Sequence, residues 1–145
     1  MKQSEIEAYV ASKNSTVLNF PDRGPWGDNR YRGNCSGWVI AYLIWRYGVK
    51  SLAELFAGGG TGSDVCRDMN ISYIGADLNP NPVRSNILTI DAVFDEVPDG
   101  FRDKDMLFMH PPYGAEGSRS DAMERVYENV KCDYHEVLRC NGSGK

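Results

Sequence analysis

Hydrophobic positions along this chain alternate between the spacing of a helix and the short continuous runs of a strand. Apolar residues at helical spacing predict helices over residues 4–13 and 36–48 and from Ser120 onward. Short apolar runs predict four strands, the first starting at Ser51 and the others covering residues 71–77, 86–90 and 105–109. Strands separated by helices or long connections are typical of an α/β fold with a mostly parallel sheet.

The first predicted strand is the centre of this pattern. Its apolar run ends in four glycines within residues 58–62, and a helical pattern follows over residues 63–69. Glycine is needed where the backbone takes a positive φ or where a ligand approaches the chain closely. The start of the following helix offers N–H groups to a carboxylate or phosphate. The order of strand, tight turn and helix indicates a ligand site, although a glycine-rich turn alone is a weak signal.

Two later strand ends strengthen this interpretation. Asp77 ends the second strand 19 residues after Gly58, and an acid at about this spacing accepts hydrogen bonds from ribose hydroxyls in βαβ units. The alternative is a solvated acid in the turn before Asn79. The strand over residues 105–109 leads into two prolines that cannot continue a sheet. His110 and Tyr113 are therefore expected to project from its carboxyl end.

The helix over residues 4–13 is expected to begin with a capping box formed by Ser4 and Glu7. Ile6, Tyr9 and Val10 would make its apolar face. Residues 14–34 are rich in Gly, Pro and Asn, which predicts a long loop of the kind that often carries function.

The helix over residues 36–48 has Ser36 as its expected N-cap and Gly48 as its stop. It is apolar on almost every side, so we expect it to be buried on more than one face. Residues 114–120 are expected to form a flexible link, and no strand is predicted after residue 109. Ser120 would cap a last helix, whose apolar stripe consists of Met123, Val126, Tyr127, Val130, Tyr134 and Leu138.

Length and composition fit one globular domain over residues 1–145, with residues 1–34 as an N-terminal helix and loop and residues 115–145 as a linker and C-terminal helix. No apolar run has the length of a membrane span, and no signal-peptide core follows Met1. The four cysteines are widely spaced without a C-x-x-C pair, so we expect reduced thiols in a cytoplasmic protein and no metal site.

The net charge of −4 is unevenly distributed, with residues 1–50 at +3 and residues 51–110 at −6. Phosphate neutralisation by Lys and Arg drives non-specific nucleic-acid binding, and no broad basic face is predicted. A small basic and aromatic cluster in the N-terminal loop is a candidate nucleic-acid contact, with a surface loop of packed aromatics as the alternative. Its members are Arg23, Trp26, Arg30, Tyr31 and Arg32.

Two stretches carry a resemblance to a known family. Residues 54–61, Glu-Leu-Phe-Ala-Gly-Gly-Gly-Thr, resemble the D-P-F-A-G-S-G-T motif of the amino-group DNA methyltransferases, which methylate N6 of adenine or N4 of cytosine with S-adenosylmethionine. Residues 110–113, His-Pro-Pro-Tyr, resemble their D/N/S-P-P-Y/F motif. The similarity runs from about Arg30 to Gly114. The two motifs in this order are fairly specific, and neither would be alone.

This resemblance implies a Rossmann-like methyltransferase fold that binds S-adenosylmethionine, with no metal and with DNA as partner. Asp77 would bind the ribose and Asp91 the adenine amino group, while residues 34–36 would hold the methionine end, although a capped core helix explains Ser36 equally well. The implied cofactor-binding residues are Asn34, Cys35, Ser36, Glu54, Phe56, Ala57, Gly58, Gly60, Thr61, Asp77, Leu78 and Asp91. The implied catalytic residues are His110, Pro111, Pro112 and Tyr113.

A sheet order of 3-2-1-4 would make the first and fourth strands neighbours, so that the glycine turn and residues 110–113 meet across one crevice. There a side chain and the carbonyl of Pro111 would accept N–H protons of an exocyclic amine, and Tyr113 would stack on a flipped base. His110 departs from the usual Asp, Asn or Ser. A neutral imidazole can accept a hydrogen bond and an imidazolium cannot, so this role would depend on pH.

Four predicted strands are fewer than the seven of the methyltransferase fold, and no target-recognition region follows. The sequence is therefore compatible with the front part of a longer enzyme, half of a split enzyme, or an inactive remnant in which His110 is structural. A non-catalytic cofactor-binding or partner-binding module, and a methyltransferase acting on RNA or on protein amide nitrogen, remain as alternatives. The choice between adenine and cytosine cannot be made from the sequence.

Overall fold

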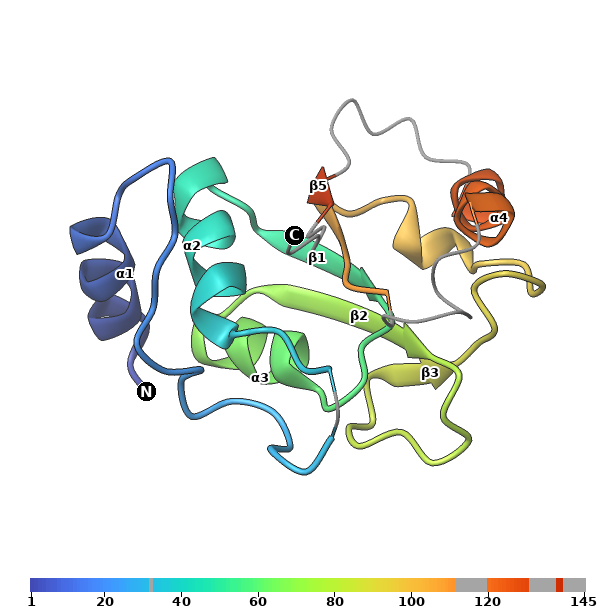
Figure 1. Ribbon diagram of the computed structural model, residues 1–145, viewed down its shortest axis with the longest axis horizontal. Helices are drawn as coiled ribbons and strands as arrows, with labels where there is room; N and C mark the ends of the chain where they lie inside the picture. The colour runs from blue at the N-terminus through green and yellow to red at the C-terminus, as the bar shows by residue number, and fades with distance from the viewer. Residues whose placement is uncertain (32, 112–119, 131–137, 140–145) are drawn as a thin grey trace.

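The centre of the computed structural model is a parallel sheet with the strand order β3-β2-β1-β4-β5 (Figure 1). The structure describes residues 1–31, 33–111, 120–130 and 138–139. The strands are β1 (Ser51–Leu55), β2 (Ser72–Asp77), β3 (Ile87–Thr89), β4 (Met106–Met109) and the two-residue β5 (Leu138–Arg139). All four strand pairs are parallel, and the predicted order 3-2-1-4 is confirmed.

Helices lie on both sides of this sheet. They are α1 (Gln3–Ser12), α2 (Gly37–Tyr47), α3 (Thr61–Asp68), the short 3₁₀ helix η1 (Asp99–Phe101) and α4 (Ser120–Val130). In Figure 1, α1, α2 and α3 form a group to the left of and in front of the strands, and η1 and α4 lie at the other side. The chain is thus an α/β protein with a parallel sheet flanked by helices, which is consistent with a Rossmann-like fold.

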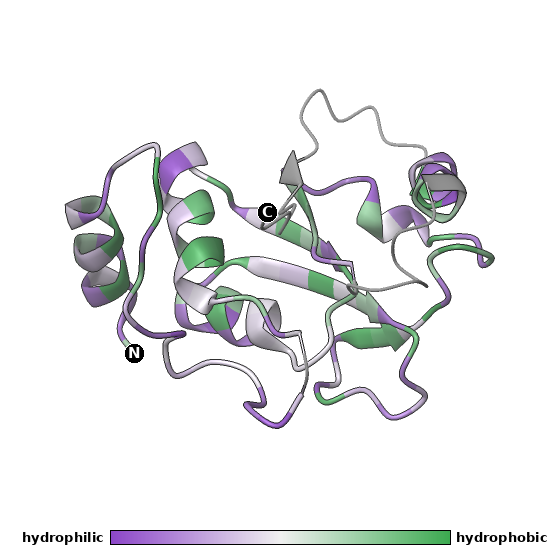
Figure 2. Cartoon of the chain, in the orientation of Figure 1, coloured by the Kyte–Doolittle hydropathy of each residue, from purple (hydrophilic) through white to green (hydrophobic). Residues whose placement is uncertain are grey.

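The side chains of each strand point alternately to the two faces of the sheet, and this divides the core into two hydrophobic clusters. Leu52 of β1 and Phe108 of β4 face the cluster shared with α1, α2 and α3. Leu55 of β1 and Leu107 of β4 face the opposite cluster, to which η1 and α4 contribute. Figure 2 shows hydrophobic residues along the strands and on the turns of α1 and α2 that face each other. Because successive side chains of a strand point to opposite faces, both layers of helices are anchored on the same short strands.

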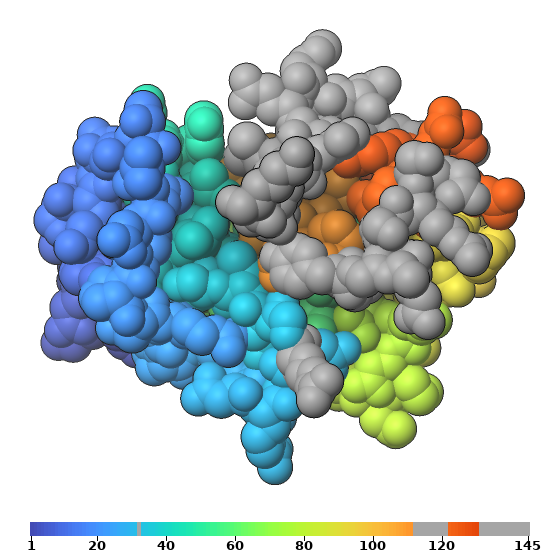
Figure 3. Space-filling model, in the orientation of Figure 1, coloured from blue at the N-terminus to red at the C-terminus, as the bar shows by residue number. Residues whose placement is uncertain are grey.

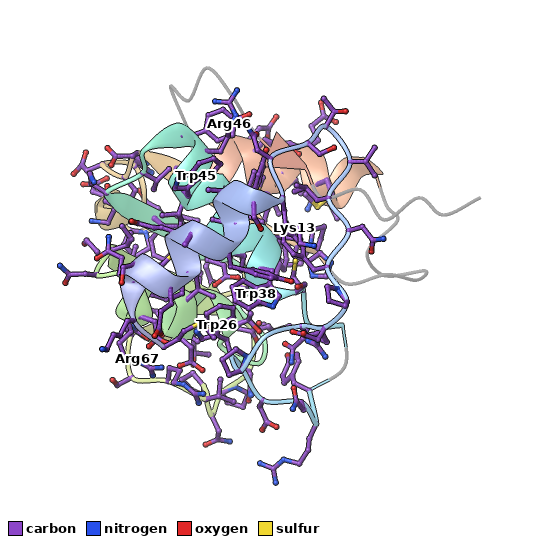
Figure 4. All side chains as sticks on the ribbon, turned by 90° about the vertical axis from the view of Figure 1, so that its left-hand side faces the viewer. Lys13, Trp26, Trp38, Trp45, Arg46 and Arg67 are labelled. Carbon is purple, nitrogen blue, oxygen red and sulfur yellow. The ribbon has the colours of Figure 1, made fainter. Side chains whose placement is uncertain are left out.

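Aromatic residues fix the N-terminal loop to the helices. Figure 4 shows Trp26 and Trp38 close together beneath α1, and their ring centroids are 4.8 Å apart. The Trp26 indole N–H donates to Asp68 of α3, and that of Trp38 donates to Asp22 of the loop. Trp26 is only 2% exposed, so it is a core residue and not part of an exposed nucleic-acid contact, which favours the alternative of packed aromatics.

Several local expectations need correction. α1 begins at Gln3, and it is Glu5 that accepts a hydrogen bond from the Lys2 N–H, so the predicted Ser4/Glu7 capping box is wrong. Ser36 is the N-cap residue of α2 but makes no side-chain capping bond. Leu138 belongs to β5, not to the last helix, so a strand does follow residue 109. Tyr134 lies outside the described residues.

The two clusters predict which substitutions destabilise the fold. Phe108 of β4 is fully buried in the cluster shared with α1, α2 and α3, and Phe108→Ala should lower the free energy of unfolding by about 3–5 kcal/mol. Phe94 is 73% exposed, and the matched Phe94→Ala change should cost less than about 1 kcal/mol. Urea denaturation of both variants measures these costs. Equal costs would show that the two clusters do not carry the stability of the sheet.

Candidate functional site

A cavity of about 610 Å³ lies outside the carboxyl ends of the parallel strands. Each of the four longer strands contributes the residues at its end: Phe56 after β1, Asp77 at the end of β2, Ile90 after β3, and His110 after β4. β1 lies between β2 and β4, so the strand order reverses at this position. In open α/β sheets such a switch point is where ligands bind. The cavity has the size of known small-molecule sites.

Most residues proposed from the sequence line this cavity. They are Asn34, Cys35, Glu54, Phe56, Ala57, Gly58, Thr61, Asp77, Leu78, Asp91, His110 and Pro111. Ser36 and Gly60 are not part of the lining. Pro112 and Tyr113 lie outside the described residues, so their predicted roles stay predictions.

The glycine turn has the backbone that its sequence suggested. Gly58 and Gly60 have φ angles of 47° and 78°, and Phe56 also has a positive φ of 63°. The Gly58 N–H donates to Asp77 Oδ2 at 2.8 Å, and the Gly60 N–H donates to the carbonyl of Ala57 at 2.9 Å. The acid at the end of β2 therefore holds the turn at the end of β1, which fixes the shape of the cavity floor.

The loop before α2 is fastened to the same turn. Asp28 N–H donates to the Gly59 carbonyl at 2.8 Å, and Gly59 N–H donates to Asn34 Oδ1 at 3.1 Å. A Cβ added at Gly59 would lie 2.4 Å from this Asn34 oxygen, so the close approach requires glycine. Figure 3 shows the blue-to-cyan loop lying beside the yellow-green segment that follows β2. The loop thus forms one wall of the cavity.

Tyr31 of this loop is a lining residue whose position the sequence did not indicate. A Cβ added at Gly58 would lie 2.9 Å from Cε1 of the Tyr31 ring, so the ring lies directly on the turn. Burial raises the pKa of Tyr31, as do the charge of Asp77 and a hydrogen bond to it. Tyr31 was expected in a candidate nucleic-acid contact, but its ring lies near Asp77, the predicted ribose-binding acid. Arg30 of that contact is exposed and paired with Asp28, and Arg32 lies outside the described residues.

A partly buried ion pair between Asp64 and Arg84 connects the cavity walls to α3. Asp64 is 5% exposed and accepts hydrogen bonds from Arg84 Nε and Nη2, both at 2.8 Å, and from the Gly27 N–H at 3.0 Å. Burial acts to raise the pKa of Asp64, but the bonds from Arg84 and Gly27 outweigh it, so this pKa lies below its usual value. The pair joins the loop before α2 and the loop after β2 through a charge-assisted contact.

Two buried polar groups, the Glu54 carboxyl and the Thr61 hydroxyl, lie beneath the glycine turn. Glu54 is 4% exposed and accepts a hydrogen bond from the Tyr73 hydroxyl. Burial raises the pKa of Glu54 to about 8, against the effect of the Tyr73 bond. Thr61, at the start of α3, has a buried Oγ1 without a hydrogen-bond partner among the described residues. A Cβ added at Gly27 would lie 2.3 Å from this oxygen, so the hydroxyl is packed against the loop before α2.

His110 stands opposite the glycine turn, at the end of β4. Burial lowers its pKa, and a hydrogen bond with the backbone of Gly33 partly opposes this effect. Burial therefore favours the neutral imidazole, which is the protonation state that the predicted acceptor role of His110 requires.

The far wall is apolar and comes from segments that no sequence motif marked. Phe94, in the connection after β3, is exposed at the rim with the Arg125 guanidinium 5.7 Å from its ring centroid. The remaining lining residues that the sequence did not indicate are Gly33, Ala76, Ile90, Ala92, Val93, Ala122, Met123 and Val126. α4 supplies the last three. An apolar wall facing acidic strand ends suits a ring system with polar edges.

Among the described lining residues there are three acids, Glu54, Asp77 and Asp91, and no Lys or Arg. Within the described ranges, no group of three or more His, Cys, Asp or Glu residues could hold a metal ion. In the same part of the chain, no helix is long and apolar enough to cross a membrane. The cavity therefore offers negative charge and hydrogen-bond acceptors to its ligand.

No protein-family model matches this chain, and no curated protein or solved structure is significantly similar to it.

The buried Glu54 carboxyl predicts how stability depends on pH. Its folded pKa of about 8 lies above the ordinary value of 4.5, so its stabilising effect is complete below pH 4.5 and is lost as the pH rises through about 8. This loss is about 1.4 kcal/mol per pH unit for one group. Glu54→Gln should flatten that part of the profile, and Glu96→Gln, which changes an exposed acid, should not. Thermal unfolding from pH 4.5 to 8 compares them, and parallel profiles for Glu54→Gln and the unmodified chain would contradict this assignment.

Proposed function

We propose that this chain is a methyltransferase, or the catalytic half of one, that transfers a methyl group from S-adenosylmethionine to the exocyclic amino group of adenine or cytosine in DNA. The observation that carries the proposal is the convergence of two motifs at one cavity. The glycine turn after β1 and the His110-Pro111 segment after β4 both line it. A methyl donor and an acceptor amine would face each other between them.

The polar groups of the cavity suit the adenosine part of this cofactor. Asp77 and Asp91, at the ends of neighbouring strands, provide acceptors for ribose hydroxyls and for an adenine amino group. Asp77 already binds the Gly58 and Asn79 N–H groups, which orients its carboxylate. The apolar wall with Met123 and Val126 suits the faces of the adenine ring. The start of α3 would offer its N–H groups to the cofactor carboxylate.

The charge of the cavity favours this cofactor over nucleotides that carry phosphates. S-adenosylmethionine has a sulfonium, an ammonium and a carboxylate, and is therefore a net cation. Phosphate sites use Lys, Arg or free backbone N–H groups, and the described lining has no Lys or Arg. The Gly58 and Gly59 N–H groups are bonded to Asp77 and Asn34. A dinucleotide or nucleoside triphosphate would therefore find little to neutralise its phosphates.

The proposed chemistry depends mainly on position. An exocyclic amine is a poor nucleophile because its lone pair is delocalised into the base. Accepting its N–H protons, at the imidazole of His110 and at the Pro111 carbonyl, would localise that lone pair. The remaining acceleration would come from holding the amine in line with the sulfonium methyl group. The base would have to leave its stack to reach the cavity, and Tyr113 is the residue we expect to stack on it.

The second candidate is a module that binds cofactor or a partner chain and does not catalyse. Its support is that the five described strands are fewer than the seven of a complete methyltransferase sheet. Cofactor binding without methyl transfer to any DNA, with partner chains supplied, would favour this candidate. Transfer to RNA or to a protein amide nitrogen would correct the substrate class only.

The cofactor site can be tested at Asp77. Asp77→Ala should weaken S-adenosylmethionine binding by about 1–3 kcal/mol, because the ribose hydroxyls lose their hydrogen-bond acceptor. Calorimetric titration of the unmodified chain and the variant measures the difference. Asp77→Asn keeps an oxygen for the glycine turn and should fall between them, while Asp103→Ala changes an exposed acid and should bind normally. An unchanged dissociation constant in folded Asp77→Ala would reject the ribose assignment.

Catalysis can be tested at His110. The rate of methyl transfer should fall as the pH drops through the His110 pKa, because the imidazolium cannot accept a hydrogen bond, and burial puts this fall below the ordinary value of 6.5. His110→Asn should flatten this limb, and His110→Ala should lower the rate by about 10²-fold or more. Incorporation of labelled methyl groups into DNA from pH 5 to 9 is the assay.

His135→Ala is the matched control, since it removes the only other histidine of the chain. This variant should keep the acidic limb. A His110→Ala protein that methylates as fast as the unmodified chain would remove His110 from the mechanism. If the limb disappears in His135→Ala instead, the pH dependence belongs to that residue.

A further inference from the structure

Arg23, in the loop between α1 and α2, has two buried nitrogen atoms that are not hydrogen-bonded. They are Nε and Nη2, and neither has a partner among the described residues. The residue as a whole is partly exposed, so its side chain can be reached from solvent. Buried polar atoms are almost always bonded, and an unpaired buried charge is costlier than an unpaired neutral group. Arg23 is therefore a candidate site for an anion from outside the chain.

Backbone contacts hold Arg23 at the start of α2. The Gly37 N–H donates to the Arg23 carbonyl at 3.0 Å. In the preceding residue, Asp22 Oδ1 accepts the Trp38 indole N–H at 2.9 Å and the Gly24 N–H at 2.7 Å. The segment on both sides of Arg23 is thus fastened, so the fold fixes the position of its backbone while the long side chain can still turn.

The neighbouring acids do not explain an arginine at this position. Each of the four acids in residues 14–34 and in α3 accepts hydrogen bonds from groups other than Arg23; they are Asp22, Asp28, Asp64 and Asp68. α2 contains no Asp or Glu. Its first residue is bonded to Arg23, and the positive end of a helix disfavours a nearby cation. Within this described part of the chain, the charge of Arg23 has no counter-ion.

The position of Arg23 relative to the cavity limits the choice of anion. Arg23 is not part of the cavity lining, so its partner is not a ligand held inside the cavity. Gly37, to which it is bonded, follows the lining residue Cys35 by two positions. Arg23 therefore lies next to the cavity wall but outside the cavity. A strand of nucleic acid whose base enters the cavity would have its phosphates in this region.

We propose that Arg23 binds a backbone phosphate of the nucleic-acid strand whose base enters the cavity. Its side chain would turn so that Nε and Nη2 donate to two phosphate oxygens, a geometry for which the guanidinium group is suited. Net charge agrees, since residues 1–50 carry +3 and residues 51–110 carry −6. This inference rests on the proposed function, because it assumes a nucleic-acid substrate.

The test is the fluorescence anisotropy of a short labelled single-stranded DNA, titrated with the full chain and S-adenosylmethionine at several salt concentrations. Arg23→Ala should weaken binding about tenfold at low salt, because a charge-assisted bond is lost. It should also reduce the slope of log K against log[salt] by about 0.7, the value for one phosphate of a single strand. Arg23→Lys keeps the charge but not the paired donors, so it should keep the slope and lose part of the affinity.

Arg46→Ala is the matched control, because Arg46 is an exposed arginine in the last turn of α2, above Trp38 in Figure 4. This variant should bind DNA as the unmodified chain does. Equal affinity and slope in Arg23→Ala and the unmodified chain would overturn the proposal. Equal losses in Arg23→Ala and Arg46→Ala would also overturn it, because the effect would then come from overall charge.

Stability separates this role from a structural one. Removal of an unpaired buried charge should leave the melting temperature of Arg23→Ala unchanged or raise it, whereas loss of a structural arginine would lower it. An Arg23→Ala protein that is less stable, or that does not fold, would therefore overturn the proposal. If DNA binds independently of Arg23, only this inference fails. If the unmodified chain binds polyglutamate through Arg23 but binds no DNA, the partner is an acidic protein segment, and the proposed DNA substrate fails as well.

Discussion

The turn between β1 and α3 is the constraint on which the rest of the cavity depends. Its backbone takes positive φ angles at Phe56, Gly58 and Gly60, a conformation that glycine adopts without strain and that Phe56 adopts only because the surrounding turn holds it. Its N–H groups are then bound by side chains from elsewhere, Asp77 at the end of β2 and Asn34 in the preceding loop. One tight turn thereby orders the loop wall and one of the strand ends of the cavity. The Asp64–Arg84 pair repeats this arrangement one helical turn later, and it joins the same loop to the segment after β2.

Features that depend on local periodicity could be predicted from the sequence. Four strands and helices α1 to α3 could be predicted from the spacing of apolar residues. The strand order could be predicted because successive βαβ units commonly build a sheet whose order reverses beside the first strand. The site residues at the strand ends could also be predicted from the sequence, because an acid or a Pro-Pro pair directly after an apolar run has few structural explanations. Asp77, Asp91 and His110 reach one cavity for this reason. Their chemical roles remain proposals, since position alone does not show what they bind.

Features that depend on distant contacts could not be predicted. Tyr31 and Arg84 lie in connections whose composition indicates only a loop, and their positions follow from contacts with Gly58 and Asp64. Trp26 looked like part of a basic surface because Arg residues flank it, yet its ring is buried against Trp38. Leu138 continued the spacing of the last helix, but β4 provides an edge on which the chain can pair instead. In each case a tertiary contact outweighed a local preference. Sequence periodicity carries no information about such contacts.

The electrostatics of the cavity connect its shape to the ligand class we propose. Near neutral pH, burial keeps both Glu54 and His110 in their uncharged forms, while the Asp77 carboxylate is held by backbone N–H groups. The cavity therefore combines the Asp77 carboxylate at the end of β2 with a neutral acid beneath the glycine turn, and its described lining has no Lys or Arg. Such a site leaves the charge of an anionic ligand unpaired, which is costly away from water. This is the physical reason why we propose a cationic cofactor and not a nucleotide that carries phosphates.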